Sequence, residues 1–445
     1  MTSFLNNYKM TNNLSLLVIL FSCIAYYLFA YQTLRTNFSQ VLSLYSFLFV
    51  CFYLLYNHSQ LNFKTLIYLG VLFRVLFLVA IPNLSDDFYR FLWDGRALFN
   101  GINPYLILPK NNPNLIINGS NLYQGMGSMN GSHYTCYPPL NQFAFTIPAI
   151  FSDSHLLIST TVMRITLILS DVITLFFGIK ILKELKLNTR KILVYFINPF
   201  ILIELTGNLH YEGMMIAFLS ASLYFLFKQK KHLSAILFAG AISIKLIPLI
   251  FLPVFYKKLG FKKLFIYGCI VALVNILLFL PFASKELYSN FMSSIELYFQ
   301  NFEFNASLYY IVREIGYRIK GYNIIQSVGK TTPFIIITIT LLLSFLRKNN
   351  LKQTLITSML WVICSYYFLS SIVHPWYIAI PLFLSLFTKY SFPVIWSFVV
   401  ILSYSAYVNS SYKENLWLVG LEYILVFGYL FAELFQWKFN RKKNL

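Results

Sequence analysis

The sequence predicts an all-α protein that crosses a membrane many times. Of its 445 residues 58% are hydrophobic and only 11% are charged, whereas charged residues make up about 25% of a soluble protein. Apolar runs of about 20 residues, the length of a spanning helix, recur along the chain. The runs are continuously apolar rather than alternating, which favours helices over a barrel. We therefore expect one integral membrane domain over residues 1–445.

The apolar runs predict about 12 spanning helices. Their expected ranges are 13–31, 40–56, 65–82, 156–179, 191–207, 211–228, 263–283, 333–347, 353–371, 375–388, 391–408 and 416–436. Two further runs are irregular. Residues 138–151 are short and bracketed by prolines, so we expect them not to cross fully. Residues 233–256 contain Lys245 and two prolines, so we expect a broken hairpin that enters and leaves on one side.

Basic residues set the expected orientation. The net charge of +20 would suggest nucleic acid in a soluble protein, but in a membrane protein lysine and arginine mark cytoplasmic loops. The basic groups lie at 180–191, 228–231, 257–263, 347–352 and 438–443. With these groups inside, both termini are cytoplasmic and most of the 15 acids lie outside. Acids contribute little to topology, so their position favours an outward-facing site. No nucleic-acid partner is expected.

Two long outer loops, residues 83–137 and 284–332, are expected to form the catalytic face. Loops of this length are usually functional or disordered. Both contain helical patches and many aromatic residues, which favours ordered helices lying on the membrane surface. We call them the first and the second long loop.

The first long loop begins with "SDDFYRFLWDGRALFNGINPY" from Ser85. Ser85 is a suitable cap, and a helix is expected from Asp87 to Asn100. On that helix Asp87, Arg90 and Asp94 share one face, while apolar residues including Phe88 and Leu92 form another face suited to lipid headgroups. One acid would satisfy the positive end of the helix. Two adjacent acids favour a site, with Asp86 free to point into a cavity.

Two motifs add charged groups near the membrane. "GNLHYEG", residues 207–213, places His210 and Glu212 in a tight turn, where a plain polar turn is the competing interpretation. "SIKLIP" places Lys245 inside an apolar run. An ionisable residue at membrane depth is a functional candidate by default, and snorkelling towards water is an equal alternative. Arg164 and Asp171 share a helical face and are expected to form structural ion pairs, direct or to neighbouring helices.

Two aromatic motifs complete the set. "FEFNASLYY", residues 302–310, contains Asn305, and "VHPWY" contains His374, Trp376 and Tyr377. An interfacial aromatic belt is the alternative for the second motif. None of the motifs has a zinc spacing, a Walker loop, a dinucleotide fingerprint or a serine elbow. Carboxylates suit general-base work on a hydroxyl, and cations and histidines suit a phosphate. This combination predicts transfer from a phosphate-linked, membrane-held donor to a hydroxyl.

The motifs together carry a family resemblance. "DDFYRFLWDGRALFNGINPY", "YPPL", "GNLHYEG", "KLIP", "EFNASLYY" and "HPWY" occur in this order between residues 86 and 377. The series resembles bacterial mannosyltransferases of the GT-C superfamily that use polyprenyl-phosphate mannose. The resemblance implies a GT-C fold, a polyprenyl-phosphate sugar donor with mannose as the default, and transfer with inversion to a hydroxyl on a lipid, a glycan or a protein.

The resemblance also implies roles for residues. The catalytic base would be Asp86 or Asp87, and Asp86 is favoured because Asp87 also serves as a helix cap. The candidates for the donor phosphate are Arg90, His210, Lys245 and His374. The candidates for the sugar or acceptor are Asp94, Glu212, Asn305, Trp376 and Tyr377. No metal or other cofactor is expected, although the two acids would suit a divalent ion.

Two alternatives remain open at this stage. A flippase or transporter of lipid-linked sugars would also be polytopic, but it would more often have related halves and polar groups near the midplane. A transferase of another phosphate-linked group, such as an aminosugar, is the second alternative. Asn83 and Asn305 begin glycosylation sequons beside the predicted site, where a glycan would obstruct. This favours a bacterial inner membrane, with the site facing the periplasm.

Overall fold

The computed structural model describes residues 10–300, 302–409 and 411–443. Within these ranges the chain is helical, and the one strand-like feature is an isolated bridge between Phe304 and Ile372. Six helices are long and apolar enough to cross a membrane. They are α2 (Asn12–Tyr31), α3 (Phe38–Asn57), α8 (Leu156–Glu184), α14 (Phe261–Phe279), α17 (Ile325–Leu346) and α21 (Leu416–Lys443). The predicted all-α membrane protein is confirmed.

The other predicted spans are shorter or broken. Three are shorter single helices: α4 (Phe63–Val75), α11 (Glu212–Phe227) and α18 (Lys352–Leu369). α12 (Lys231–Ile244) belongs to the irregular run 233–256. The run 191–207 is divided into η2 (Thr189–Ile192), α9 (Leu193–Phe196), α10 (Pro199–Ile201) and the π-helical η3 (Leu202–Gly207). Pro199 lacks a backbone N–H, and the Asn198 side chain accepts from Phe200 N at 2.9 Å, so a new helix begins there.

The last two predicted spans before α21 are also composite. They consist of η6 (Pro375–Ile378), α19 (Ala379–Ser385), α20 (Phe392–Val399) and η7 (Val400–Val408). Several of the predicted spans are therefore not single helices, and the prediction of about 12 spans is not confirmed. Prolines at 375, 381 and 393 account for part of the difference, because proline interrupts the helical hydrogen bonding or begins a new helix.

The predicted break in the run 233–256 is present. α12 ends at Ile244, Lys245 has extended backbone (φ −145°, ψ 138°), and the 3-10 helix η4 (Ile247–Phe255) and α13 (Tyr256–Leu259) follow. The run 138–151 forms α7 (Pro139–Phe151), a helix of 13 residues. At 1.5 Å per residue α7 is about 20 Å long, shorter than the hydrocarbon core of about 30 Å.

The helix at the start of the first long loop is not a surface helix, contrary to the prediction. α5 (Asp87–Phe99) is covered by α6 (Gly119–Gly131) and α7. Phe88 and Leu92, predicted to face lipid headgroups, are buried. The reason is that the rest of the loop folds back over α5. α7 packs so closely that a Cβ at Gly95 would lie 1.9 Å from the Phe145 carbonyl oxygen.

The second long loop agrees better with the prediction of surface helices. It forms α15 (Leu287–Gln300) and α16 (Leu308–Lys320). α16 exposes a row of large apolar residues, with Ile311 and Ile319 60% and 72% exposed. The bridge between Phe304 and Ile372 ties the loop that precedes α16 to the segment before η6.

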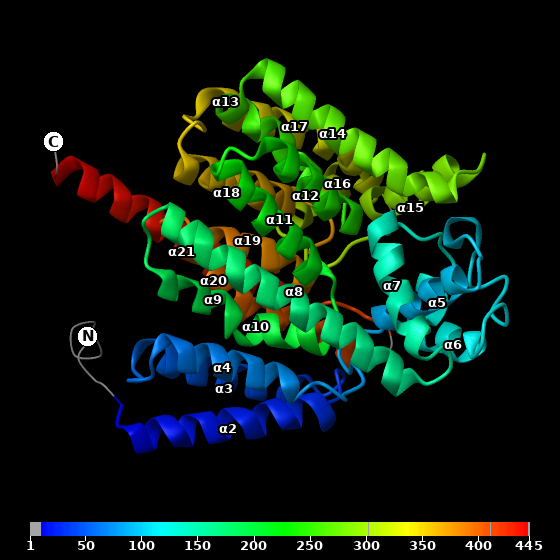
Figure 1. Cartoon of the computed structure of the whole chain (residues 1–445), viewed down its shortest axis with the longest axis horizontal. Coiled ribbons are helices and arrows are strands. Elements are labelled where there is room, and N and C mark those ends of the chain that lie inside the picture. Colours follow the sequence, from blue (N-terminus) through cyan, green and yellow to red (C-terminus); the bar gives the residue numbers. More distant parts are fainter. Residues whose placement is uncertain (1–9, 301, 410, 444–445) are drawn as a thin grey trace.

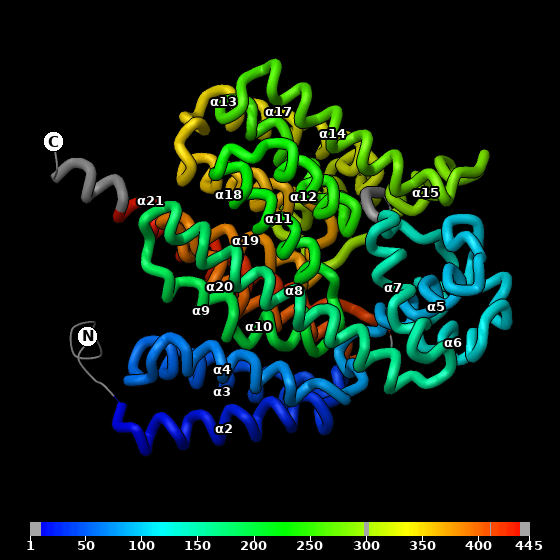
Figure 2. Tube along the Cα trace, viewed as in Figure 1, coloured from blue at the N-terminus to red at the C-terminus, as the bar shows by residue number. Residues whose placement is uncertain are grey.

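Figure 1 shows how the bundle places these loops. α5, α6, α7 and α15 gather at one end (right in the figure), while α2 begins and α21 ends at the other. α2, α3 and α4 lie together along one edge, and the Cα trace in Figure 2 shows the same arrangement. The basic group at 438–443 belongs to the part of α21 whose side chains are outside the described ones.

Buried arginines join the helices. Arg74 Nε donates to Asp171 Oδ2 at 2.9 Å, and Arg74 Nη1 donates to the Phe196 carbonyl at 2.7 Å. This pair connects α4, α8 and α9. Asp171 thus forms its ion pair with a neighbouring helix. Arg164 lies on the same face of α8 but donates to backbone carbonyls instead.

Candidate active site

Most of the predicted site residues gather where the segments before α5, α11 and η6 meet the break after α12. We call this group the polar cluster. Its members are Asp86, Asp87, His210, Glu212, Lys245, His374, Trp376 and Tyr377. Each member lies at a helix start, in a turn or at the break. The bundle therefore collects these side chains from four separate parts of the sequence.

Lys245 and Glu212 form the first contact in the cluster. The break at Lys245 directs its ammonium to Glu212 Oε1, with which it forms an ion pair. The ammonium also lies 5.9 Å from the ring centre of Tyr137 and 6.0 Å from that of Tyr377. Glu212 Oε2 is buried and has no hydrogen-bond partner among the described residues. Lys245 therefore does not snorkel alone towards water, and it leaves one carboxylate oxygen of Glu212 for a ligand.

The two adjacent acids have different surroundings. Asp86 precedes α5, and its Oδ2 pairs with Arg35 Nη2 at 2.5 Å. Asp87 begins α5 and makes a hydrogen bond with Asn130. The pKa of Asp87 is raised to about 6: burial is the largest cause, the charges of Glu212 and Asp86 also raise it, and the charge of Lys245 lowers it. A carboxylate with such a pKa can accept a proton close to neutral pH.

The imidazole of His210 and that of His374 both stack on the Trp376 indole. The ring centres lie 3.7 Å and 4.6 Å from Trp376, and the planes differ by 17° and 7°. Burial and the charge of Lys245 lower the pKa of His374 to about 3. Its imidazole is therefore neutral at pH 7, and it can offer a hydrogen bond to a ligand but no charge.

Polar contacts hold the turn that carries His210 and Glu212. Arg164 donates to the carbonyls of Thr206 at 3.0 Å, Gly207 at 3.2 Å and Leu78 at 2.9 Å. Leu209 has a φ of +63°, a left-handed conformation that bulky residues rarely adopt. Strained residues of this kind concentrate at functional sites. The turn is thus fixed from α8.

Glu204 supports the same turn from η3. Its carboxylate accepts from Asn208 Nδ2 at 3.2 Å and from Tyr404 Oη at 2.7 Å, and it lies 3.9 Å from His210 Nε2. The sequence analysis did not select Glu204. An acid inside the apolar run 191–207 was the available signal, and it was missed because the run was assigned as an ordinary span.

Arg90 and Asp94 form an ion pair of their own beside the polar cluster. Arg90 Nε pairs with Asp94 Oδ1 at 2.8 Å, and Arg90 Nη1 donates to the carbonyls of Asn130 and His133. Asp94 is completely buried. This pair fastens the end of α6 to α5, next to the Asn130 that contacts Asp87. Contacts of Arg90 with a phosphate and of Asp94 with a sugar stay predictions.

Asn305 is also removed from the cluster. Its side chain is completely buried, its N–H donates to Glu414 Oε1 at 2.6 Å, and its Nδ2 donates to Glu422 Oε1 at 3.1 Å. Tyr423 Oη donates to its carbonyl at 2.7 Å. The surroundings of Asn305 connect the second long loop to α21, and its predicted contact with a sugar stays a prediction.

Arg35 is the second residue that the sequence analysis missed. It lies between α2 and α3 and reaches Asp86 at the edge of the cluster. Arg35 lies outside residues 86–377, over which the motifs carry the family resemblance. The available signal was that Arg35 is the only Asp, Glu, Lys or Arg between Met10 and Phe63, in a segment predicted to lie outside.

No metal site is formed within the part of the chain that the structure describes. There, no three or more histidine, cysteine, aspartate or glutamate side chains are grouped so that they could hold an ion. The expectation that the protein uses no metal therefore stays a prediction.

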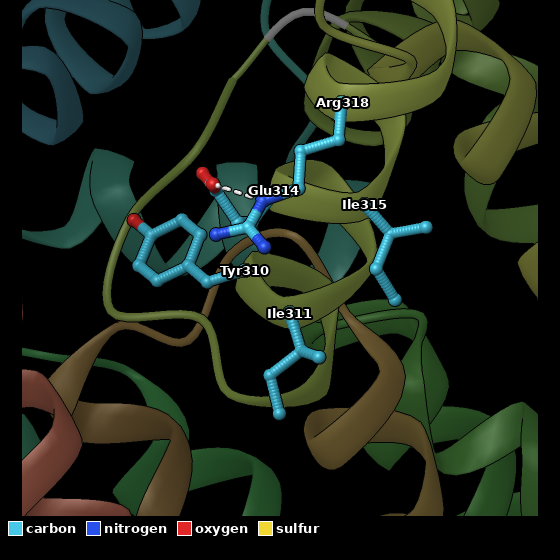
Figure 3. A pocket seen from close by; sticks show the side chains of 5 residues that line it. All are labelled: Tyr310, Ile311, Glu314, Ile315 and Arg318. Carbon is cyan, nitrogen blue, oxygen red and sulfur yellow. Dashed lines mark hydrogen bonds and ion pairs between the residues drawn. The ribbon is translucent and has the colours of Figure 1, made fainter.

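A shallow pocket of about 430 Å³ lies elsewhere, on α16. It is lined by Tyr310, Ile311, Glu314, Ile315 and Arg318. In Figure 3 the Arg318 guanidinium reaches back to Glu314, to which it donates at 3.0 Å. None of these residues belongs to the polar cluster, so the pocket and the cluster are separate features.

The arrangement defines a class of protein. Acids, a lysine, neutral imidazoles and aromatic rings at one end of a membrane bundle suit a transferase that works on polar groups at the membrane. The sequence profile described as "Alpha-(1->6)-mannopyranosyltransferase, N-terminal domain" matches residues 12–258, more than half of the chain. The chain belongs to this mannosyltransferase family. The matched region contains every member of the polar cluster except His374, Trp376 and Tyr377.

A curated relative agrees with the family. Alpha-(1->6)-mannopyranosyltransferase A of Mycobacterium tuberculosis is 22% identical over 177 residues, which are 40% of this chain and 33% of the relative. The chain thus aligns with about a third of that protein. The resemblance to bacterial mannosyltransferases, read from the motifs, is confirmed.

Proposed function

We propose that this protein is a GT-C mannosyltransferase that moves mannose from a polyprenyl phosphate to a hydroxyl acceptor, with inversion at the anomeric carbon. The polar cluster is the observation that carries the proposal. It joins a carboxylate with a pKa of about 6, a lysine–glutamate pair and stacked aromatic rings at one end of membrane helices. The family supports mannose as the sugar.

We assign the general base to Asp87. The sequence favoured Asp86 because Asp87 was expected to serve as a helix cap. In the structure Asp86 is paired with Arg35, whereas Asp87 is under the direct influence of Lys245 and Glu212 in the cluster. A base is most effective when its pKa is close to the working pH. The surroundings of Asp87 therefore support it over Asp86.

The reaction follows from these roles. Asp87 takes the proton of the acceptor hydroxyl as its oxygen attacks the anomeric carbon of the mannose. The bond from that carbon to the phosphate oxygen breaks, and its electron pair leaves with the polyprenyl phosphate. Attack opposite to the leaving group inverts the configuration. Phosphate is a good leaving group, so the step requires no strong general acid.

The other members of the cluster bind the donor in this proposal. Lys245, His210 and His374 contact the phosphate, the lysine by charge and the neutral imidazoles by N–H donation. The unpartnered oxygen of Glu212 accepts from a sugar hydroxyl. Trp376 and Tyr377 line the sugar site. No metal is invoked, since the carboxylate and the phosphate leaving group suffice.

The proposed location is a bacterial inner membrane with the cluster on the periplasmic side. Two side chains support it. Asn83 Nδ2 donates to the carbonyls of Phe29 at 2.8 Å and Thr33 at 2.5 Å, and Asn305 is completely buried. A glycan on either sequon asparagine would break these contacts, which disfavours a lumen where sequons are glycosylated. The acceptor belongs to lipid, glycan or protein.

A comparison of two mannose donors, one linked to a lipid and one to a nucleotide, tests the proposal. The full chain, reconstituted in nanodiscs with a lipid extract of a bacterial host, is given labelled polyprenyl-phosphate mannose or GDP-mannose. We expect labelled mannose in the extract only with the lipid-linked donor. Transfer from GDP-mannose alone would contradict the donor assignment. No transfer from either donor, together with movement of the lipid-linked sugar across vesicles, would replace the enzyme by a flippase.

A further inference from the structure

Arg35 is built into the edge of the polar cluster. The loop between α2 and α3 is fastened to the segment before α5, because Asn83 Nδ2 donates to the carbonyls of Phe29 and Thr33. Tyr31 Oη also donates to the Leu76 carbonyl at 3.0 Å. These bonds set the guanidinium beside Asp86. Its position is therefore a feature of the fold and does not depend on a loose surface contact.

Arg35 is also the most available of the cations near the acids. Lys245 is paired with the buried Glu212, and Arg90 is held by Asp94 and two carbonyls, which leaves only its buried Nη2 without a partner among the described residues. Within the described residues Arg35 has one ion-pair partner, Asp86, whose side chain is 37% exposed. The guanidinium lies over the Tyr407 ring, 5.2 Å from its centre. Five N–H donors serve one carboxylate oxygen, so several remain for a second anion.

We propose that Arg35 binds the phosphate of the lipid-linked donor, and that Asp86 is the counter-ion with which this phosphate competes. The inference rests on the proposed function. It adds a phosphate-binding residue, Arg35, and a competing counter-ion, Asp86. A partly exposed ion pair is held less tightly than a buried one, whereas the arginine fork matches the oxygens of a phosphate. A phosphate that arrives beside Asp86 can therefore take over Arg35.

The charge on the phosphate explains why an arginine is useful there. The donor phosphate is a diester with one negative charge. When the bond to the anomeric carbon breaks, the phosphate becomes a monoester and gains a second charge. Arg35 binds the more charged form more tightly, so it stabilises the transition state more than the bound donor. The same reasoning predicts tight binding of the polyprenyl monophosphate product.

Binding of polyprenyl monophosphate tests the inference without requiring transfer. The full chain in neutral-lipid nanodiscs is titrated with the lipid, and binding is followed by the tryptophan fluorescence. We expect Arg35→Gln to raise the Kd at least tenfold and Arg35→Lys to raise it less. Arg318→Gln, which breaks an exposed arginine–glutamate pair on α16, is the matched control and should bind as the wild type does. A thermal melt of each variant establishes that it is folded.

Asp86→Asn provides the sharper variant. Because Asp86 competes for Arg35, its removal should tighten binding of the monophosphate several-fold. This gain should shrink markedly when Arg35→Gln is also present. Tighter binding that is equally large in both backgrounds, or unchanged binding in Arg35→Gln, would overturn the inference. Weaker binding of the monophosphate by Asp86→Asn would contradict the proposal that Asp86 competes with the phosphate for Arg35.

Two further titrations, one with an ion and one with a lipid, identify which phosphate-bearing molecule Arg35 binds. Inorganic phosphate and anionic phospholipid are titrated against the wild type and Arg35→Gln. If either depends on Arg35 as strongly as the polyprenyl monophosphate does, the residue is a general phosphate or headgroup contact and the donor assignment is wrong. Arg35-dependent binding of the monophosphate without any mannose transfer would contradict the proposed function alone. Mannose transfer with unchanged Kd in Arg35→Gln would contradict this inference alone.

Discussion

Asp86 and Asp87 are neighbours in sequence, but the fold gives them different partners. Asp86 is turned to Arg35 and Asp87 to the group around Lys245 and Glu212. The distinction arises because Asp86 precedes α5 and Asp87 is its first residue, so their side chains leave the backbone in different directions. At the scale of single residues, this separation is what makes one acid a base and the other a counter-ion in our account.

The raised pKa of Asp87 predicts a pH profile. As the base, Asp87 works only when it is ionised, so kcat/KM should fall as the pH drops through about 6, roughly tenfold for each further pH unit. The measurement is the initial rate of mannose transfer at low donor concentration between pH 4.5 and 8. In Asp86→Asn the fall should move to lower pH, because the charge of Asp86 helps to raise the pKa of Asp87. A rate that stays level down to pH 4.5 would contradict the assignment.

Among the elements, the second long loop and α21 are held together by buried polar groups. Glu422 Oε1 accepts from Asn305 Nδ2 at 3.1 Å and from Trp396 Nε1 at 3.0 Å. On the other side of the same loop, Phe304 pairs with the segment that leads to His374. The loop thus connects α21 to the stacked rings of the cluster. It supports the cluster through the backbone, without reaching it with the Asn305 side chain.

This connection predicts a stability effect for Asn305. In Asn305→Ala the Glu422 carboxylate loses a buried donor, which costs about 1–3 kcal/mol. We expect a lower unfolding temperature in a thermal melt of the detergent-solubilised protein, with the donor KM nearly unchanged. Glu422→Gln, which keeps an acceptor oxygen, is the control and should lose less. A large rise in the donor KM at unchanged unfolding temperature would instead favour the direct sugar contact predicted from the sequence.

The sequence predicted which elements form better than it predicted how they pack. The break at Lys245 and the short helix 139–151 could be anticipated because prolines and a buried cation mark them. The burial of α5 could not, since its apolar residues suit a lipid surface and a covering helix equally well. Likewise, the sequence around Asn305 does not indicate that this residue lies under α21, because its partners Glu414 and Glu422 are more than a hundred residues away.

The site was predictable to the extent that its residues are unusual in their local sequence. Acids at a membrane edge, a lysine in an apolar run and a histidine in a tight turn all stand out. Arg35 and Glu204 do not belong to any motif, and their roles depend on contacts with Asp86 and His210. Such contacts are made by the packing of distant helices and are visible only in three dimensions.

At the scale of the whole molecule, the two ends of the helical bundle carry different elements and different charges. α5, α6, α7 and α15 lie at one end, and the first and last spanning helices have their chain-terminal ends at the other. The basic residues 257–263 lie in α13 and the first turn of α14, and α13 lies far from α5, α6 and α7. This division agrees with the proposed orientation, in which the basic end is cytoplasmic. In the proposed function, a lipid-held donor reaches the cluster from the membrane and the acceptor reaches it from the periplasm.

The central claim is that Asp87, the first residue of α5, is the general base of mannose transfer. Its most direct test is single-turnover transfer of labelled mannose from polyprenyl phosphate by the wild type, Asp87→Asn, Asp86→Asn and the control Arg318→Gln, each folded by thermal melt. We predict that Asp87→Asn loses transfer by about 10²–10⁴-fold, that Asp86→Asn retains most of the single-turnover rate, and that the control is unchanged. Full activity in Asp87→Asn would contradict the account, and loss confined to Asp86→Asn would move the base to the neighbouring residue.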